Sequence, residues 1–307
     1  MRPKLQTLYL HVVGMLMLIW PAAMTAQTPN AQAYLMHRVA IIDEESGREV
    51  SSDPNTEEAQ NAETTGQSTA CGKSSGTLNL VEHNGHFFLL GTAHGFYEDG
   101  QLKCDAGFGT FYPDVQYHAN QADTEINFKR GYRFSLPPLN YETALKNTSD
   151  IAIRSDKNAD DFAVFQIEDA EVLKRQMGGH RRALKMDSTP SRDLVELANA
   201  EDVFFIGRRE NFHGLKKVSI EYKCQILELP GSDIIMRHTC DMGGGSSGAA
   251  LIYWRDSVQL ELIGVNYGDA HFDGVARDIH NSDQGNFFIP SEHIIKTLDQ
   301  LFPPADG

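Results

Sequence analysis

The sequence predicts an all-β protein built from two β-barrels and ending in one helix. From about residue 70 onward, the chain is a succession of short apolar segments with strand-like composition. Gly and Asn turn signals separate these segments, and an amphipathic helical pattern appears at the end of the chain. The strand-rich part divides into two halves of about 100 to 125 residues, a size that fits one barrel each.

The N-terminus has the pattern of a signal peptide over residues 1–26. A basic start precedes an apolar core at residues 8–20, and small residues suited to cleavage follow, with Ala26 as the preferred site and Ala33 as a second candidate. The apolar run is shorter than the roughly 20 residues of a membrane span, although an uncleaved anchor is an alternative. We therefore expect a secreted or periplasmic protein with no membrane attachment in its mature form.

Residues 27–69 are expected to form an acidic, disordered arm, which is either a pro-segment or a linker. The stretch from residue 44 to 69 is polar and acidic and contains no aromatic residue, so it has little apolar surface to bury. The N-terminal barrel is then expected at residues 70–175. The C-terminal barrel and the terminal helix are expected at 176–307.

The first half opens with a predicted hairpin. Residues 76–81 form its first strand, Asn84-Gly85 is a strong two-residue turn signal, and residues 86–92 form the returning strand. The other strand candidates of this half are 109–112, 125–128, 132–136, 151–153 and 162–167.

The second half has the same succession of short apolar segments separated by turn residues, and it ends in a helix. Its strand candidates are 203–207, 216–223, 234–238, 249–253, 260–267 and 287–289. A helix is expected from residue 292 to 301, because Ile294, Ile295, Leu298 and Leu301 recur at helical spacing and form one apolar face.

Charge and cysteine content restrict the class of protein further. The net charge of -15 argues against a nucleic-acid partner, since phosphate binding needs clustered Lys and Arg. Four cysteines in an exported chain suggest two disulfides. Three pairings are possible, and pairing of neighbours, Cys71–Cys104 and Cys224–Cys240, is the simplest. No Cys or His cluster has the spacing of a zinc site, so we expect no metal and no cofactor.

A glycine-rich stretch interrupts the strand pattern of the second half. Residues 243–248 read Gly-Gly-Gly-Ser-Ser-Gly. Glycine permits positive φ and close backbone approach, so the stretch is suited to present a serine hydroxyl and to direct backbone N–H groups at an oxyanion. The alternative is a flexible turn between two strands.

A nucleophilic serine needs a base, and the base needs an acid that orients it. His94 is the best candidate base, because it lies among small residues at the end of an apolar strand. Asp161 is the preferred acid, because it directly precedes the apolar run 162–167. Asp150 precedes the shorter run 151–153 and is the second candidate.

These residues resemble the motifs of the chymotrypsin-like serine proteases. Thr-Ala-His at 92–94, Asp-Phe-Ala-Val at 161–164 and Gly-Ser-Ser-Gly-Ala at 245–249 occur in that family's order of His, Asp and Ser. The strand at 262–268 is similar to the one that lines the family's substrate cleft. The resemblance extends over residues 70–303 and is strongest to the bacterial trypsin-like and glutamyl-endopeptidase-like branch. It implies two six-stranded β-barrels with a C-terminal helix.

The resemblance also implies a function and residue roles. The protein would be a secreted serine endopeptidase that acts on proteins or peptides through an acyl-enzyme. Ser247 would be the nucleophile, His94 the general base and Asp161 the acid that orients it. The backbone N–H groups of Gly245 and Ser247 would form the oxyanion hole.

Substrate recognition is expected from residues around the serine loop and on the strand after it. The candidates are Asp241, His238, Asn266, Tyr267 and Gly268. Asp241 lies six residues before Ser247, where a trypsin has the residue that selects Arg or Lys in the substrate. The alternative is that Asp241 is a structural residue of the loop.

One departure from the family pattern affects activation. Ser246 stands where trypsins have the aspartate that receives the new N-terminal amine, so this activation contact is expected to be absent.

Two other functions are alternatives to a serine endopeptidase. A protease-like binding protein without turnover is one alternative. The other is an α/β-hydrolase esterase in which Ser246 is the nucleophile of Gly-x-Ser-x-Gly. That fold needs a helix directly after the serine, whereas residues 249–254 are strand-like.

Overall fold

The fold was analysed in a computed structural model of the 307-residue chain. The residues that the structure describes are 39–42, 49–51, 65–70, 73–98, 100–103, 107–112, 115–117, 126–128, 131–144, 159–168, 183–200, 203–208, 218–222, 224–232, 234–240, 245–255, 259–268 and 286–304. The predicted signal peptide at 1–26 and the predicted barrel boundary at 175 lie outside these residues.

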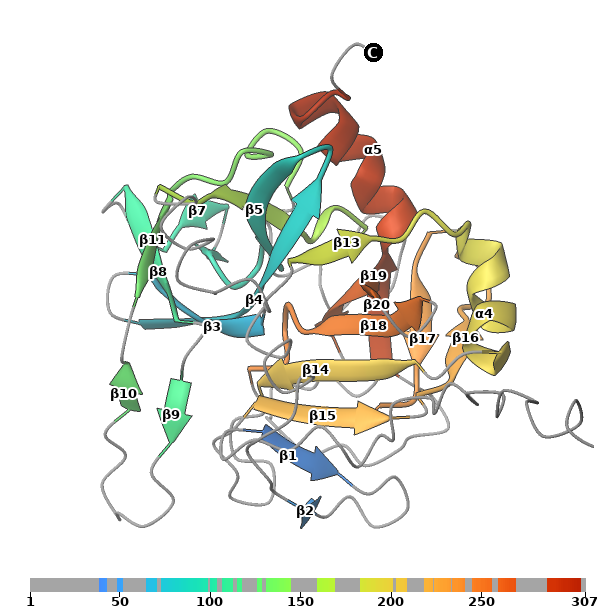
Figure 1. The fold of residues 1–307 in the computed structure, drawn as a ribbon. Coiled ribbons are helices and arrows are strands. Elements are labelled where there is room, and N and C mark those ends of the chain that lie inside the picture. The colour runs from blue at the N-terminus through green and yellow to red at the C-terminus, as the bar shows by residue number, and fades with distance from the viewer. Residues whose placement is uncertain are drawn as a thin grey trace, which may run out of the picture. The chain divides into compact units, whose positions relative to one another are not determined.

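Six antiparallel strands form the first barrel, and Figure 1 labels most of them. They are β3 (Thr65–Ala70), β4 (Lys73–His83), β5 (His86–Gly91), β8 (Phe108–Tyr112), β11 (Tyr132–Ser135) and β12 (Ala163–Gln166). Neighbouring strands pair in the order β11-β8-β3-β4-β5-β12. A β-bridge between Phe134 and Ile167 brings the two ends of this order together, so the barrel closes on itself.

A second set of strands forms the second barrel. Its strands are β14 (Phe204–Arg208), β15 (Val218–Tyr222), β16 (Ile226–Glu228), β17 (Met236–His238), β18 (Ala250–Arg255), β19 (Gln259–Gly268) and β20 (Asn286–Pro290). Pairing runs β15-β14-β18-β19-β20-β17-β16. Strands β15 and β16 stand at the two ends of this order and are close neighbours in sequence.

Shorter elements connect and flank the barrels. Strand β13 (Leu184–Met186) pairs in parallel with β4 of the first barrel and with β19 of the second. It leads into a 3₁₀ turn and helix α4, and helix α5 follows β20 directly (Figure 1). The 3₁₀ turn spans Ser191–Asp193, helix α4 spans Leu194–Ala200 and helix α5 spans Ser291–Leu301. The peripheral strands are β1 (Val39–Ile42), β2 (Glu49–Ser51), β6 (Tyr97–Glu98), β7 (Gln101–Leu102), β9 (Val115–Tyr117) and β10 (Ile126–Phe128).

Three hydrophobic clusters explain why so many strands are apolar on both faces. One cluster fills the first barrel and another fills the second. The third contains residues of both barrels, such as Leu90 and Ile252, together with Ile294 and Leu298 of α5. Because successive side chains of a strand point to opposite faces, Leu89 enters the first barrel while Leu90 packs in the third cluster. The predicted all-β fold of two β-barrels with a C-terminal helix is confirmed.

The structure departs from the expected arm at three places. Within 27–69, short strands occur at β1 and β2, and β3 begins at Thr65 as a full member of the first barrel. The composition of β3 suggested disorder because its side chains are small and polar. The barrel satisfies them internally, since Thr65 Oγ1 donates to Asn79 Oδ1 at 2.8 Å and Ser68 Oγ donates to the Gly76 carbonyl at 3.0 Å. The rest of the arm lies outside the described residues.

Candidate active site

Three of the predicted residues meet in a chain of hydrogen bonds that crosses from one barrel to the other. His94 and Asp161 belong to the first barrel, and Ser247 lies in the loop before β18 of the second. The Oγ of Ser247 lies 2.8 Å from Nε2 of His94. The Nδ1 of His94 lies 2.7 Å from Oδ2 of Asp161. The geometry is that of a nucleophile, a base and an orienting acid.

Strand pairing in the first barrel places His94 beside Asp161. β5 and β12 run antiparallel with Gly91 opposite Ala163. His94 therefore follows the end of one strand where Asp161 precedes the start of its partner. The backbone confirms this neighbourhood, because the Ala93 N–H donates to the Asp161 carbonyl at 3.4 Å.

The carboxylate of Asp161 fixes both the backbone and the ring of His94. Its Oδ1 accepts the His94 backbone N–H at 2.8 Å, and its Oδ2 faces the ring Nδ1. Asp161 is fully buried, whereas the His94 side chain is 19% exposed. Since an ionised carboxylate only accepts hydrogen bonds, Nδ1 carries the proton. The lone pair of Nε2 is then directed at the hydroxyl of Ser247. Asp150, the second candidate for this role, lies outside the described residues.

The loop that carries Ser247 needs glycine at both ends. Gly245 and Gly248 have φ values of 86° and 87°, a region that side chains other than glycine rarely adopt. A Cβ on Gly248 would also clash with the carbonyl oxygen of Thr77 in the first barrel. Glycine at this position therefore lets the serine loop approach the opposite barrel.

Every carbonyl of residues 245–248 accepts a hydrogen bond from a neighbouring strand. Thr77 of β4 donates its Oγ1–H to Gly245 O at 2.8 Å and its N–H to Ser247 O at 2.9 Å. The other two carbonyls accept from buried asparagines, Ser246 O from Asn266 Nδ2 at 2.9 Å and Gly248 O from Asn79 Nδ2 at 2.6 Å. Within the described part of the chain, the N–H groups of Gly245 and Ser247 donate no hydrogen bond to another described residue.

Thr77 and Asn79 are site residues that sequence analysis missed. Both are buried in β4 and reach the serine loop from the other barrel. The signal that was available is their alternation with Leu78 and Leu80, which puts the two polar side chains on the opposite face of the strand from the two leucines. The partner of that polar face is about 170 residues away and leaves no local trace in the sequence.

The two adjacent serines have different surroundings. Ser246 is fully buried, whereas Ser247 is partly exposed and its Oγ contacts His94. Strand β18 begins three residues after Ser247, where an α/β-hydrolase would need a helix. The structure therefore offers Ser247, and not Ser246, to His94.

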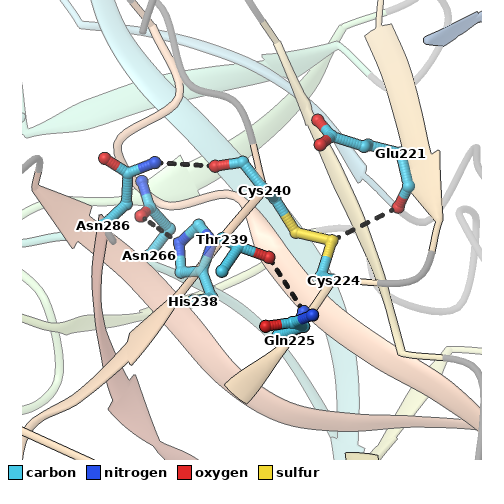
Figure 2. The surroundings of a disulfide bond; sticks show 8 residues. All are labelled: Glu221, Cys224, Gln225, His238, Thr239, Cys240, Asn266 and Asn286. Carbon is cyan, nitrogen blue, oxygen red and sulfur yellow. Dashed lines mark hydrogen bonds between the residues drawn. A yellow bond between two sulfur atoms is a disulfide. The ribbon is translucent and has the colours of Figure 1, made fainter. Parts of the chain in front are cut away.

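The predicted substrate-binding residues divide into three groups. Asp241 lies outside the described residues. His238, Asn266 and Tyr267 are buried, with His238 Nε2 3.0 Å from Asn266 Oδ1, and Gly268 is half-buried at the end of β19. The side chains of His238 and Asn266 thus face each other inside the second barrel (Figure 2).

The predicted disulfide Cys224–Cys240 is present next to this pair (Figure 2). Both cysteines are buried in the second barrel. The amide of Asn286 on β20 donates to the Cys240 carbonyl at 2.6 Å, and Thr239 Oγ1 accepts the Gln225 N–H at 2.9 Å. The chain entering the serine loop is therefore fastened covalently and by hydrogen bonds. The predicted Cys71–Cys104 bond involves residues outside the described part.

The described residues show neither a metal-binding group nor a membrane-spanning helix. Their His, Cys, Asp and Glu side chains form no group of three or more that could hold a metal ion. Among them, no helix has the length and apolar character needed to cross a membrane.

Comparisons with known proteins gave matches in solved structures alone. No family model and no curated protein matches the chain. An inactive serine-to-alanine mutant of Rv3671c from M. tuberculosis H37Rv matches at 13% identity and a TM-score of 0.44, covering 84% of this chain and 98% of its own. The thermostable serine protease AL20 from an extremophilic microorganism matches at 13% identity and 0.48, with 78% and 99% covered. Kallikrein-related peptidase 10 matches at 11% identity and 0.47, with 80% and 98% covered.

Proposed function

We propose that this protein is a secreted serine endopeptidase that cleaves proteins or peptides through an acyl-enzyme. The observation that carries the proposal is the continuous hydrogen-bonded series from Ser247 Oγ through His94 to Asp161, at 2.8 and 2.7 Å. Export is part of the proposal because of the signal-like N-terminus and the disulfide Cys224–Cys240. The net charge of -15 is compatible with a protein substrate and does not favour a nucleic acid.

The proposed reaction begins with attack of Ser247 Oγ on the substrate carbonyl carbon. His94 Nε2 takes the hydroxyl proton as the new C–O bond forms, and Asp161 stabilises the imidazolium. The negative oxygen of the tetrahedral intermediate accepts from the N–H groups of Gly245 and Ser247. One such donor is typically worth about 100- to 1,000-fold in kcat.

Collapse of the intermediate breaks the peptide bond. His94 returns the proton to the leaving amine, and the acyl group stays on Ser247 as an ester. Water then attacks the ester with His94 again as the base, which releases the carboxylic acid and restores the hydroxyl. Every proton movement in this cycle takes place at Nε2, the nitrogen that faces Ser247.

Covalent labelling with a fluorophosphonate tests the nucleophile. The wild-type protein is expected to be labelled on Ser247, because His94 activates that hydroxyl. Ser247→Ala must abolish labelling, and Ser246→Ala is the matched control that keeps it. Failure of the wild type to react would favour a binding protein without turnover. Labelling that survives Ser247→Ala but is lost in Ser246→Ala would favour the esterase alternative.

A further inference from the structure

We propose that Asn266 is a positioning residue that sets the direction of the Ser247 N–H, one of the two oxyanion donors. The catalytic consequence of this inference rests on the proposed function, but its structural consequence does not. Asn266 lies on β19, is fully buried, and donates from Nδ2 to the carbonyl oxygen of Ser246 at 2.9 Å. We assign it to the loop backbone and not to contact with substrate.

The planarity of the peptide bond links this contact to the oxyanion hole. The C=O of Ser246 and the N–H of Ser247 belong to the same trans peptide and point in opposite directions. A hydrogen bond that holds the oxygen therefore fixes where the N–H points. The side chain of Asn266 acts on the catalytic donor through this one rigid unit, without touching the substrate.

The Ser246 carbonyl has a second donor, which does not replace the first. The Ala249 N–H donates to it at 2.9 Å, and a carbonyl oxygen accepts two hydrogen bonds. Because the Ala249 N–H belongs to the same loop as the Ser246 carbonyl, this hydrogen bond does not fix the loop relative to the barrel. Asn266 instead ties the loop to the barrel. Its backbone is bonded to the end of the loop, since Gly248 N–H donates to Asn266 O at 2.8 Å and Asn266 N–H donates to Ala249 O at 2.9 Å, and on its other side it lies opposite Phe288 of β20.

His238 holds the side-chain amide of Asn266 in the required orientation. Nδ2 must face the Ser246 carbonyl, because only the NH₂ end can donate. Oδ1 then faces His238 Nε2 at 3.0 Å, so His238 donates from Nε2. The His238 ring is itself fixed, since it is fully buried and stacks on Phe205 with ring centroids 5.6 Å apart. Figure 2 shows the ring directed at the Asn266 amide.

The variant Asn266→Asp tests this arrangement with little change in shape. It replaces the donating NH₂ by an acceptor that repels the Ser246 carbonyl, so we expect the 246–247 peptide to turn. By comparison with loss of an oxyanion donor, kcat per active site should fall about 10- to 100-fold. KM should stay within a few-fold, because ground-state binding is not affected. Active sites are counted by fluorophosphonate titration to completion, so that unfolded molecules do not enter kcat.

Asn286→Asp is the matched control. Asn286 is also a buried strand asparagine whose Nδ2 donates to a carbonyl, that of Cys240. Its partner, the Cys240 carbonyl, lies six residues before Ser246 and is not part of the Ser246–Ser247 peptide. This variant is expected to lower stability while keeping kcat per titrated site within a few-fold of the wild type.

Crystal structures of the ligand-free wild type and Asn266→Asp give a readout that is independent of activity. A turned 246–247 peptide in the variant supports the inference, even if the wild type proves inactive and the proposed function fails. An unturned peptide, or an unchanged kcat per titrated site in an active enzyme, overturns it. If Asn266→Asp does not fold, His238→Phe decides. It keeps an aromatic ring but lacks the donor, so it must release the Asn266 amide and lower kcat, and no change in either overturns the inference.

Discussion

At the scale of single residues, Asp161 does two things that a surface carboxylate would not do. One oxygen accepts the backbone N–H of His94 and the other faces its ring. The backbone bond fixes the carboxylate, and the carboxylate in turn fixes the tautomer of the ring. Full burial of Asp161 strengthens both contacts, because the local dielectric constant is low.

Asp161→Asn is predicted to lower kcat by about 10,000-fold, the size that such a change has in other Ser-His-Asp enzymes. An amide has one acceptor oxygen. If that oxygen keeps the His94 backbone N–H, the NH₂ group faces Nδ1 and forces the ring proton onto Nε2, which then cannot accept from Ser247. Steady-state hydrolysis of a peptide ester per titrated site measures the effect.

The neighbouring residue provides the control for this prediction. Asp160 has a side chain that is 52% exposed and lies 3.3 Å from His293. Asp160→Asn should therefore leave kcat close to the wild-type value. Equal losses in the two variants would show that Asp161 has no special relation to His94.

At the scale of elements, Glu292 joins the connection between the barrels to the C-terminal helix. Its Oε2 accepts the Ser191 N–H at 2.8 Å and the Ser191 Oγ–H at 2.9 Å. Glu292 lies in the first turn of α5 and Ser191 begins the 3₁₀ turn after β13. The backbone hydrogen bond from Ser191, with help from its hydroxyl and from Lys296, holds the pKa of Glu292 below its ordinary value of 4.5.

This lowered pKa predicts how Glu292→Gln depends on pH. A carboxyl with a depressed pKa in the folded state stabilises the protein above its unfolded pKa, and the contribution is lost as pH falls through the folded pKa. Urea unfolding should therefore show the variant to be less stable than the wild type at pH 7. The difference should shrink as pH falls below 4.5. A difference that is the same at both pH values would contradict this role.

At the scale of the whole molecule, the serine loop of one barrel is held largely by the other. Thr77 and Asn79 cross from the first barrel to three carbonyls of the loop, while Asn266 holds the fourth from within the second barrel. The nucleophile and its base also come from different barrels. The site therefore exists only when both barrels are folded and packed.

This division explains which features could be predicted from the sequence. Strand composition and turns indicate the barrels, and the order of the His, Asp and Ser motifs indicates the three residues that meet. Hydrogen bonds between distant strands leave no comparable pattern. The polar composition of β3 predicts that it belongs to the acidic arm, because the hydrogen-bond partners of Thr65 and Ser68 become visible only in the folded barrel. Closeness in sequence to the serine loop predicts a place in the cleft for His238, and the family resemblance of its strand predicts the same for Asn266, yet neither side chain is exposed.

Cleavage of a peptide library by the purified protein, followed by mass spectrometry, tests the central claim most directly. The wild type is predicted to generate new N-termini within the peptides, and Ser247→Ala and His94→Ala are predicted to generate none above background. Ser246→Ala, which leaves the Ser247–His94 contact in place, should retain cleavage. A wild-type protein that produces no internal cleavage, or a Ser247→Ala protein that cleaves at the wild-type rate, would contradict the account.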